Sequence, residues 1–306
     1  MEEIPKATCL AWVAGRLMPD GGYCAFRDAE TRAGFSNIAD TAHALEIFRR
    51  LGEPPPELSR TAAWIDSLEK ASLALTRSPA LAWALSARVH AGLPWRDKER
   101  WLFLEEVERL LDDGEREESE GVDADLASLL RLPRTPDLPG PLARRLPALV
   151  DLLEAREGEE GRPLTLPALE DRMTVIEKGG GPSPEEIRRR SHEEERFRHP
   201  VWGWIRTRGS TATDLFVIRA GVRLADLLQA PFDVDLIQDL VLACRSRSGG
   251  FGPLPGAIPG LDATLCAVEI LQRLPPFQGS SRAKARPDQG LIPENTLGPE
   301  CPREDP

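Results

Sequence analysis

Three polar residues at the starts of predicted helices could carry out acid–base chemistry. Asp40 and His43 are three residues apart, so their side chains would share one helical face. Asp262 stands at the start of a similar segment near the C-terminus. A carboxylate and an imidazole can exchange a proton with a bound ligand, and converging helix N-termini would add a positive field that suits a diphosphate. We predict Asp40, His43 and Asp262 as catalytic residues; the alternative for Asp40 is a helix cap.

A second set of residues could bind a ligand. The stretch FRHPVWGWIRTRGS, residues 197–210, combines arginines with tryptophans. A guanidinium presents a planar fork that fits phosphate oxygens, and an indole ring can pack against a hydrocarbon tail. The predicted ligand-binding residues are Trp83, His199, Trp202, Trp204, Arg206 and Arg208. The alternatives are ordinary exposed arginines in a loop and tryptophans that pack in the core.

The elements that position these residues belong to an internal repeat. Residues 13–51 and 243–274 carry the same features in the same order, with a loop five residues longer in the first copy. The matched residues are Gly21, Gly22 and Tyr23 with Gly249, Gly250 and Phe251, and Thr41 with Thr264. Weaker copies are found at 78–94 and 210–228. A repeat of paired helices, spaced by about 45 to 60 residues, is typical of stacked-helix proteins.

The repeat predicts an all-α fold with two kinds of helix. The second helix of each copy is apolar on several faces, as in 42–51, and such a helix should be enclosed. The helices between the copies carry more charge and suit an outer layer; they are predicted at 57–74, 98–111, 142–155, 184–197 and 234–243. The charged stretches 112–123 and 156–163 are expected to be loops. Inner and outer helices that alternate describe either an open solenoid or a closed α/α toroid of helical hairpins.

The glycine pair with an aromatic residue, the Pro/Gly loop and the segment DATLCAVEIL at 262–271 resemble the repeat of protein prenyltransferase β subunits and squalene or oxidosqualene cyclases. The resemblance is good over the first and last copies and weak over the middle of the chain. It implies an α/α toroid whose central cavity binds an isoprenoid or another apolar ligand. The expected function is therefore that of a divergent prenyltransferase-like or terpenoid-cyclase-like protein. The alternative is a non-catalytic helical-repeat scaffold for a protein partner.

The usual catalytic motifs of that superfamily are missing from the sequence. Ala263 stands before Thr264, where the zinc enzymes have a histidine, and no Asp-x-Cys pair occurs. The stretches at Asp123 and Asp233 lack the final residue of Asp-x-Asp-Asp, and both aspartates fit helix caps, as Ser183 does. Aromatic residues make up only 6% of the chain, so few aromatic rings are available to stabilise a carbocation through cation–π attraction. No metal or cofactor is expected.

Composition limits the other classes of function. The chain has 306 residues, 41% of them hydrophobic, and a formal net charge of −11, which argues against nonspecific binding to nucleic acid or to an anionic membrane. No stretch is long and apolar enough to span a bilayer. Five cysteines without a Cys-x-x-Cys pair fit reduced thiols in the cytoplasm. We expect a toroid domain over residues 1–277 and a disordered tail over 278–306.

Overall fold

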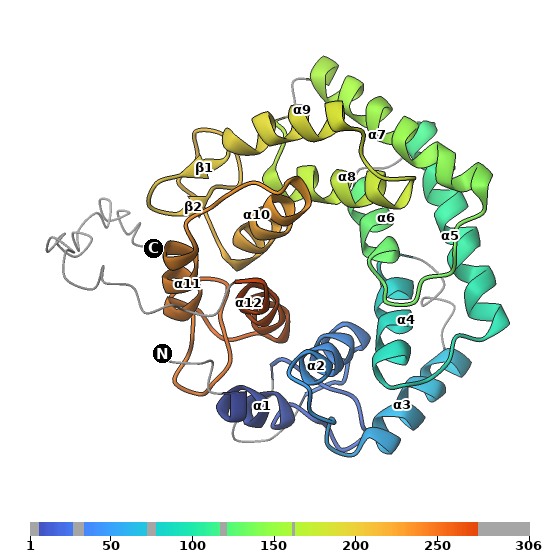
Figure 1. The fold of residues 1–306 in the computed structure, drawn as a ribbon. Helices are drawn as coiled ribbons and strands as arrows, with labels where there is room; N and C mark the ends of the chain where they lie inside the picture. The colour runs from blue at the N-terminus through green and yellow to red at the C-terminus, as the bar shows by residue number, and fades with distance from the viewer. Residues whose placement is uncertain (1–5, 27–33, 72–77, 117–120, 161–162, 275–306) are drawn as a thin grey trace, which may run out of the picture. The chain divides into compact units, whose positions relative to one another are not determined.

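The structure is a computed structural model that describes residues 6–26, 34–71, 78–116, 121–160 and 163–274 (Figure 1). Contacts group residues 2–275 into one compact unit, and every element below belongs to it. The expected tail, residues 278–306, lies outside the described residues. The elements are α1 (Lys6–Ala14), α2 (Ile38–Arg50), α3 (Leu58–Ala71), α4 (Ala80–His90), α5 (Asp97–Glu115), α6 (Val122–Leu130), α7 (Gly140–Glu160), α8 (Leu166–Lys178), α9 (Pro184–Glu195), β1 (Arg198–His199), β2 (Gly203–Trp204), α10 (Leu215–Leu228), α11 (Val234–Ala243) and α12 (Leu261–Arg273).

The all-α prediction is confirmed at the level of secondary structure, with one small exception. Strands β1 and β2 form an antiparallel hairpin in which Arg198 pairs with Trp204 and His199 with Gly203. Two-residue strands are too short to leave an alternating pattern in the sequence, so the hairpin was not predicted. The expected loops were also too long, because α5 continues to Glu115, α6 begins at Val122 and α7 continues to Glu160.

Side-chain caps fix where several helices begin. Ser183 and Asp233 are the N-caps of α9 and α11, as predicted, and their side-chain oxygens accept backbone N–H bonds of 3.1 and 3.0 Å. The prediction for Asp123 is wrong: Gly121 occupies the cap position of α6. The carboxylate of Asp123 instead accepts a hydrogen bond of 3.1 Å from the buried Arg172.

The even-numbered helices contact one another in order along the chain. Helix α2 packs against α4, α4 contacts α6, and the same relation continues from α6 to α8, α10 and α12. Helix α12 also packs against α2, so the last even-numbered helix is a neighbour of the first. Gln272 donates a hydrogen bond of 2.6 Å to the backbone oxygen of Arg50. Because both residues lie at the C-terminal ends of their helices, α2 and α12 are parallel and in register.

The two strong copies of the repeat have the same backbone turn. The N–H of Tyr23 donates to the Thr41 hydroxyl, and the N–H of Phe251 donates to the Thr264 hydroxyl, both at 3.0 Å. Each threonine hydroxyl in turn donates to the backbone oxygen four residues earlier, at 2.8 and 2.7 Å. The matched threonines therefore tie the glycine turn to the first turn of the following helix.

The glycine pairs allow a tryptophan of another helix to approach the turn. A Cβ atom on Gly22 would lie 2.8 Å from the ring of Trp64 in α3, and one on Gly250 would lie 2.5 Å from the ring of Trp12 in α1. Only glycine fits such close approaches. Helix α1 thus packs on the last copy of the repeat as α3 packs on the first.

The Thr264→Val substitution is expected to lower the free energy of unfolding by about 2 kcal/mol. Valine has a similar shape, but it leaves the N–H of Phe251 and the oxygen of Gly260 without this buried partner. Urea denaturation measures the loss. Thr264→Ser is the control because it keeps the hydroxyl, and it should cost clearly less. Equal losses for the two variants would contradict the role given to the hydroxyl.

None of the helices in the described ranges combines the length and the apolar character needed to cross a bilayer. The four cysteines of the described part of the chain are free and buried: Cys9, Cys24, Cys244 and Cys266.

Candidate functional site

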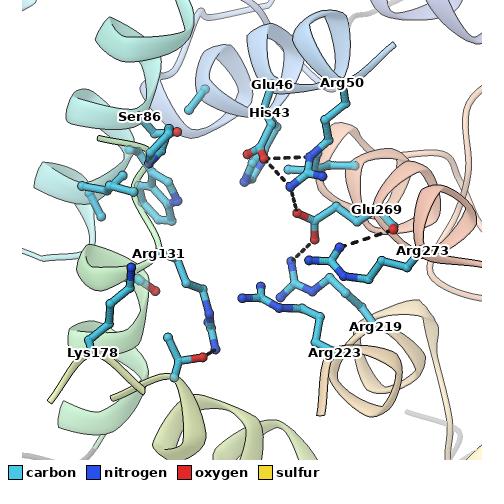
Figure 2. Close-up of a pocket in the computed structure, with 18 of the residues that line it drawn as sticks. His43, Glu46, Arg50, Ser86, Arg131, Lys178, Arg219, Arg223, Glu269 and Arg273 are labelled. Carbon is cyan, nitrogen blue, oxygen red and sulfur yellow. Dashed lines mark hydrogen bonds and ion pairs between the residues drawn. The ribbon is translucent and has the colours of Figure 1, made fainter. Parts of the chain in front are cut away.

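A cavity of about 440 Å³ lies between the even-numbered helices, each of which contributes to its lining. Figure 2 shows cationic side chains from several of these helices directed toward it. Ten lining residues carry an ionisable side chain: His43, Glu46, Arg50, Arg131, Glu177, Lys178, Arg219, Arg223, Glu269 and Arg273. The other polar ones are Ser86, Ser128 and Thr174, and the remaining six are apolar. The cavity is therefore chiefly a polar, cation-rich site.

The cavity lies toward the C-terminal halves of several helices. Arg50, Lys178 and Arg273 stand in the last turns of α2, α8 and α12, and Arg131 is the C-cap of α6. A helix C-terminus carries partial negative charge, which these cations partly offset. The positive charge of this cavity thus comes from side chains and not from helix N-termini.

A carboxylate of α12 organises one wall of the cavity. Glu269 is 5% exposed and pairs with Arg50 of α2 and, at 3.7 Å, with Arg219 of α10. Arg50 also donates a hydrogen bond of 2.8 Å to Glu46. Burial opposes ionisation of Glu46, but the neighbouring His90 and Arg50 outweigh it and lower its pKa to about 2. Glu46 therefore stays ionised, and both glutamates hold Arg50 in place.

A carboxylate of α8 holds two further arginines of the lining. Glu170 is 2% exposed and accepts a hydrogen bond of 2.6 Å from Arg131. It also forms an ion pair of 3.1 Å with Arg223. Arg131 further donates to Asp171 at 2.6 Å, and burial raises the pKa of Asp171 to about 6 although Arg131 opposes the shift. Glu170 thus anchors arginines that come from two different parts of the chain.

Two arginines of α10 keep unused hydrogen-bond donors at the cavity. Arg219 makes no hydrogen bond to any residue that the structure describes, and its Nε atom is buried. The terminal nitrogens of Arg223 are likewise without a hydrogen bond in the described ranges. Burial lowers the pKa of Arg223, Glu170 opposes this, and the Arg131 charge adds to it. A guanidinium has five N–H donors, so an acceptor-rich anion in the cavity would satisfy groups that the protein leaves open.

The three predicted catalytic residues lie near one another, but only His43 lines the cavity. Asp40 accepts hydrogen bonds from the N–H of Ala25 at 2.8 Å and from the side chain of Asn37, which is the N-cap of α2. Asp262 is exposed and accepts from the N–H of Ala263 at 2.7 Å. Asp40 therefore has a local structural role at the start of α2, close to the predicted alternative.

The imidazole of His43 lies on the cavity wall, in the electrostatic field of several charged neighbours. Burial lowers its pKa, while Asp262, Asp40 and Glu46 act to raise it and Arg219 to lower it. Its Nδ1 atom is buried and has no hydrogen-bond partner in the described part of the chain. The neutral imidazole thus offers one more polar group to a ligand.

The predicted ligand-binding residues are divided between two places. Trp83 of α4 lines the cavity. The other five lie on or beside the β1–β2 hairpin and do not line it: His199, Trp202, Trp204, Arg206 and Arg208. Trp204 is buried and donates a hydrogen bond of 2.5 Å to Glu194, and Arg206 pairs with Asp214 at 2.7 Å. The structure therefore does not bring the hairpin residues together with His43.

The sequence contains one signal for the arginines that were not predicted. Arg219 and Arg223 are four residues apart in LFVIRAGVRLADLL, which is otherwise almost entirely apolar. Two charges on one face of a buried helix need partners or a ligand, so this spacing could have indicated them. Arg131 and Glu170 offer no comparable local signal, because their role depends on the contact between α6 and α8.

A pH effect on stability should be traceable to His43. The native pKa is below 6.5, so the unfolded chain binds more protons below that pH, and stability present above 6.5 is lost as the pH falls. The unfolding free energy of the wild-type protein, measured in urea, should fall between pH 7.5 and pH 5.5. This fall should exceed that of the His43→Gln variant by up to about 1 kcal/mol. The comparison cancels the contribution of Asp171, which has the opposite sign. An equal pH dependence in both proteins would contradict the assignment.

A second cavity, of about 530 Å³, is a weaker candidate. It lies beside Val89, Trp95, Arg100 and Arg134. Both of its arginines are exposed and lack a buried carboxylate to hold them among the described residues. We therefore take the cavity between the even-numbered helices as the candidate site.

The described residues contain no group of three or more His, Cys, Asp and Glu side chains placed to hold a metal ion. No protein-family model matches the sequence, and comparison with curated proteins gives no significant match.

Proposed function

We propose that the even-numbered helices are the inner helices of an α/α toroid, and that the central cavity binds a small molecule through a diphosphate or a comparable polyanionic group. The order of helix contacts, with α12 beside α2, supports the closed arrangement. The packing of α1 on the last repeat copy, equivalent to that of α3 on the first, supports it independently. A cytoplasmic location is part of the proposal and agrees with the free cysteines of the described ranges.

The unused donors of Arg219 and Arg223 are the observation that carries the binding function. Together with Arg131 they direct guanidinium groups from α10 and the end of α6 toward one space (Figure 2). Hydrogen bonds between guanidinium and phosphate are charge-assisted and bidentate, so they combine affinity with orientation. Buried Glu170 and Glu269 form ion pairs with all three of these arginines, which reduces the entropy lost on binding.

The ligand that the family resemblance implies is an isoprenoid diphosphate. The arginines would bind its head group, and Trp83 would be the main contact for the tail. The proposal is a binding function and assigns no reaction step, because His43 is the only predicted catalytic residue on the cavity wall.

Binding of inorganic pyrophosphate, measured by isothermal titration calorimetry, tests the proposal. We expect binding that weakens with added salt, and a loss of affinity of about tenfold or more in Arg223→Gln, because a charge-assisted hydrogen bond contributes about 1.5–3 kcal/mol. Arg188→Gln is the matched control, because Arg188 is exposed on α9 and its loss changes the net charge equally. No binding, or equal affinities of the two variants, would refute the proposal.

The second candidate is the protein-binding scaffold. Exposed apolar side chains on the loops that precede α2 and α12 favour it: Phe26, Phe35, Leu254 and Ile258. Because α2 and α12 are parallel, these loops lie at the same end of the helices. Absence of pyrophosphate binding, together with a specific protein complex that is lost in Phe35→Ser and Ile258→Ser, would support the scaffold instead.

A further inference from the structure

We infer that the organic part of the ligand is a compact hydroxylated ring, as in a phosphorylated sugar or a nucleoside phosphate, and not a long hydrocarbon chain. This inference rests on the proposed function, because it concerns the part of the ligand that extends from the polyanionic group. It differs from the isoprenoid that the family resemblance implies. Three properties of the cavity wall carry it.

The first property is the scarcity of accessible apolar surface. The six apolar lining residues are Ala42, Ala82, Trp83, Leu132, Pro133 and Leu265. Four of these are almost completely covered by the protein, with exposed fractions of 2% for Ala42, 3% for Ala82, 7% for Leu132 and 5% for Leu265. Hydrocarbon binding is favourable in proportion to the apolar area removed from water. A prenyl tail could make apolar contacts with Trp83 and Pro133. Its other contacts would be with charged groups, whose desolvation opposes binding.

The second property is a set of uncommitted hydroxyl groups away from α10. Ser86 of α4 and Ser128 of α6 line the cavity, are partly exposed, and make no side-chain hydrogen bond within the described part of the chain. Glu177 of α8 lines it too and is exposed. Hydroxyl and carboxylate oxygens can accept from sugar hydroxyls, and serine can also donate. Such groups reject a hydrocarbon, because its binding would leave them desolvated and unpaired.

The third property is the position of Trp83 among these polar groups. Its indole is partly exposed on the same helix as Ser86, one turn earlier. A flat aromatic face with hydroxyl donors beside it suits a ring that has an apolar face and a polar edge, such as a sugar or a base. With the guanidinium groups of α10 on another wall, the cavity would hold the phosphates at one side and the ring at the other.

Competitive calorimetry with four ligands tests this inference on the full chain. The ligands are inorganic pyrophosphate, adenosine 5′-diphosphate, fructose 1,6-bisphosphate and geranyl diphosphate. At least one of the two ring-containing ligands should bind about tenfold more tightly than pyrophosphate, and geranyl diphosphate should stay within about threefold of it. The better of the two ring ligands then distinguishes a nucleoside from a sugar.

Substitutions on the ring side separate this inference from the proposed function. Trp83→Leu and Ser86→Ala should each bring the dissociation constant of the ring-containing ligand to within about threefold of that of pyrophosphate. Tighter binding of geranyl diphosphate than of both ring ligands, or equal binding of all four, would overturn the inference while pyrophosphate binding would still support the proposed function. Failure of pyrophosphate and of both ring ligands to bind would refute both.

Discussion

The Glu170→Gln substitution is expected to lower the free energy of unfolding by about 3 kcal/mol, because it removes the charge that two partly buried arginines share. Glu170 is 2% exposed, and its carboxylate contacts Arg131 at 2.6 Å and Arg223 at 3.1 Å. The charges of Arg131, Arg223 and Arg219 hold the pKa of Glu170 below its usual value although burial acts to raise it. Glutamine keeps the size of the side chain, so the loss would report the charge. Urea denaturation measures it.

The matched control for this experiment is Glu177→Gln. Glu177 lies on the same helix and lines the same cavity, but it is exposed and forms no ion pair within the described ranges. Its replacement should change the unfolding free energy by less than about 0.5 kcal/mol. A comparable loss in both variants would show that the effect does not come from the buried carboxylate.

The same pair of variants separates charge from positioning at the candidate site. Each substitution makes the cavity more positive by one charge, so a purely electrostatic effect would strengthen pyrophosphate binding in both. We expect this for Glu177→Gln. In Glu170→Gln, however, Arg131 and Arg223 lose the group that holds them, and binding should weaken. Tighter binding in Glu170→Gln would show that its role is not to position the arginines.

Helices α3, α5, α7, α9 and α11 and the repeat ends could be predicted because their signals are local. Helix α11 has the predicted bounds of 234–243, with Asp233 as its cap. The glycine pairs and the threonines 13 to 18 residues after the aromatic position reappear as the same hydrogen-bonded turn in both copies. These residues act on their own stretch of backbone, so their pattern is visible without knowledge of the partners.

Helix α8 could not be predicted in the same way, because it buries polar residues. Glu170, Arg172 and Thr174 are each 2% exposed, and each has a partner on another part of the chain or on its own helix. A buried face that contains charges does not show the apolar periodicity that indicates an amphipathic helix. For helix α6, the sequence predicted a start near Asp123 but no end.

The sequence could indicate residues of the candidate site only where they lie close together on one helix. His43, Glu46 and Arg50 follow one another at helical spacing in the sequence, and all three line the cavity. Arg131 and Glu170 are 39 positions apart, and their hydrogen bond depends on the packing of α6 on α8. The hairpin residues were grouped with the site because arginine and tryptophan suit a phosphorylated ligand, but residue type does not determine which cavity a side chain faces.

The Gly249→Ala substitution should have the largest effect on stability, a loss of about 4 kcal/mol in the free energy of unfolding. Gly249 has a φ angle of +106°, where an L-residue is strained. An added Cβ atom would also lie 2.5 Å from the backbone oxygen of Thr8 in α1, and backbone cannot move aside as a flexible side chain can. To accept the methyl group, α1 would have to shift away from the last repeat copy, together with Trp12, whose ring lies against Gly250.

Gly256→Ala controls for backbone strain alone. Gly256 lies in the same loop and also has a positive φ angle, +79°, but no atom lies within 4 Å of the position of its Cβ. Its substitution should cost about 1–2 kcal/mol. The difference between the two variants in thermal or urea denaturation therefore measures the contact between α1 and the last copy. Because Gly21, at +103°, is in the same position against Arg60 of α3, Gly21→Ala should resemble Gly249→Ala. If Gly249→Ala costs no more than Gly256→Ala, α1 does not complete the last repeat copy, and the argument from α1 for a closed toroid fails with it.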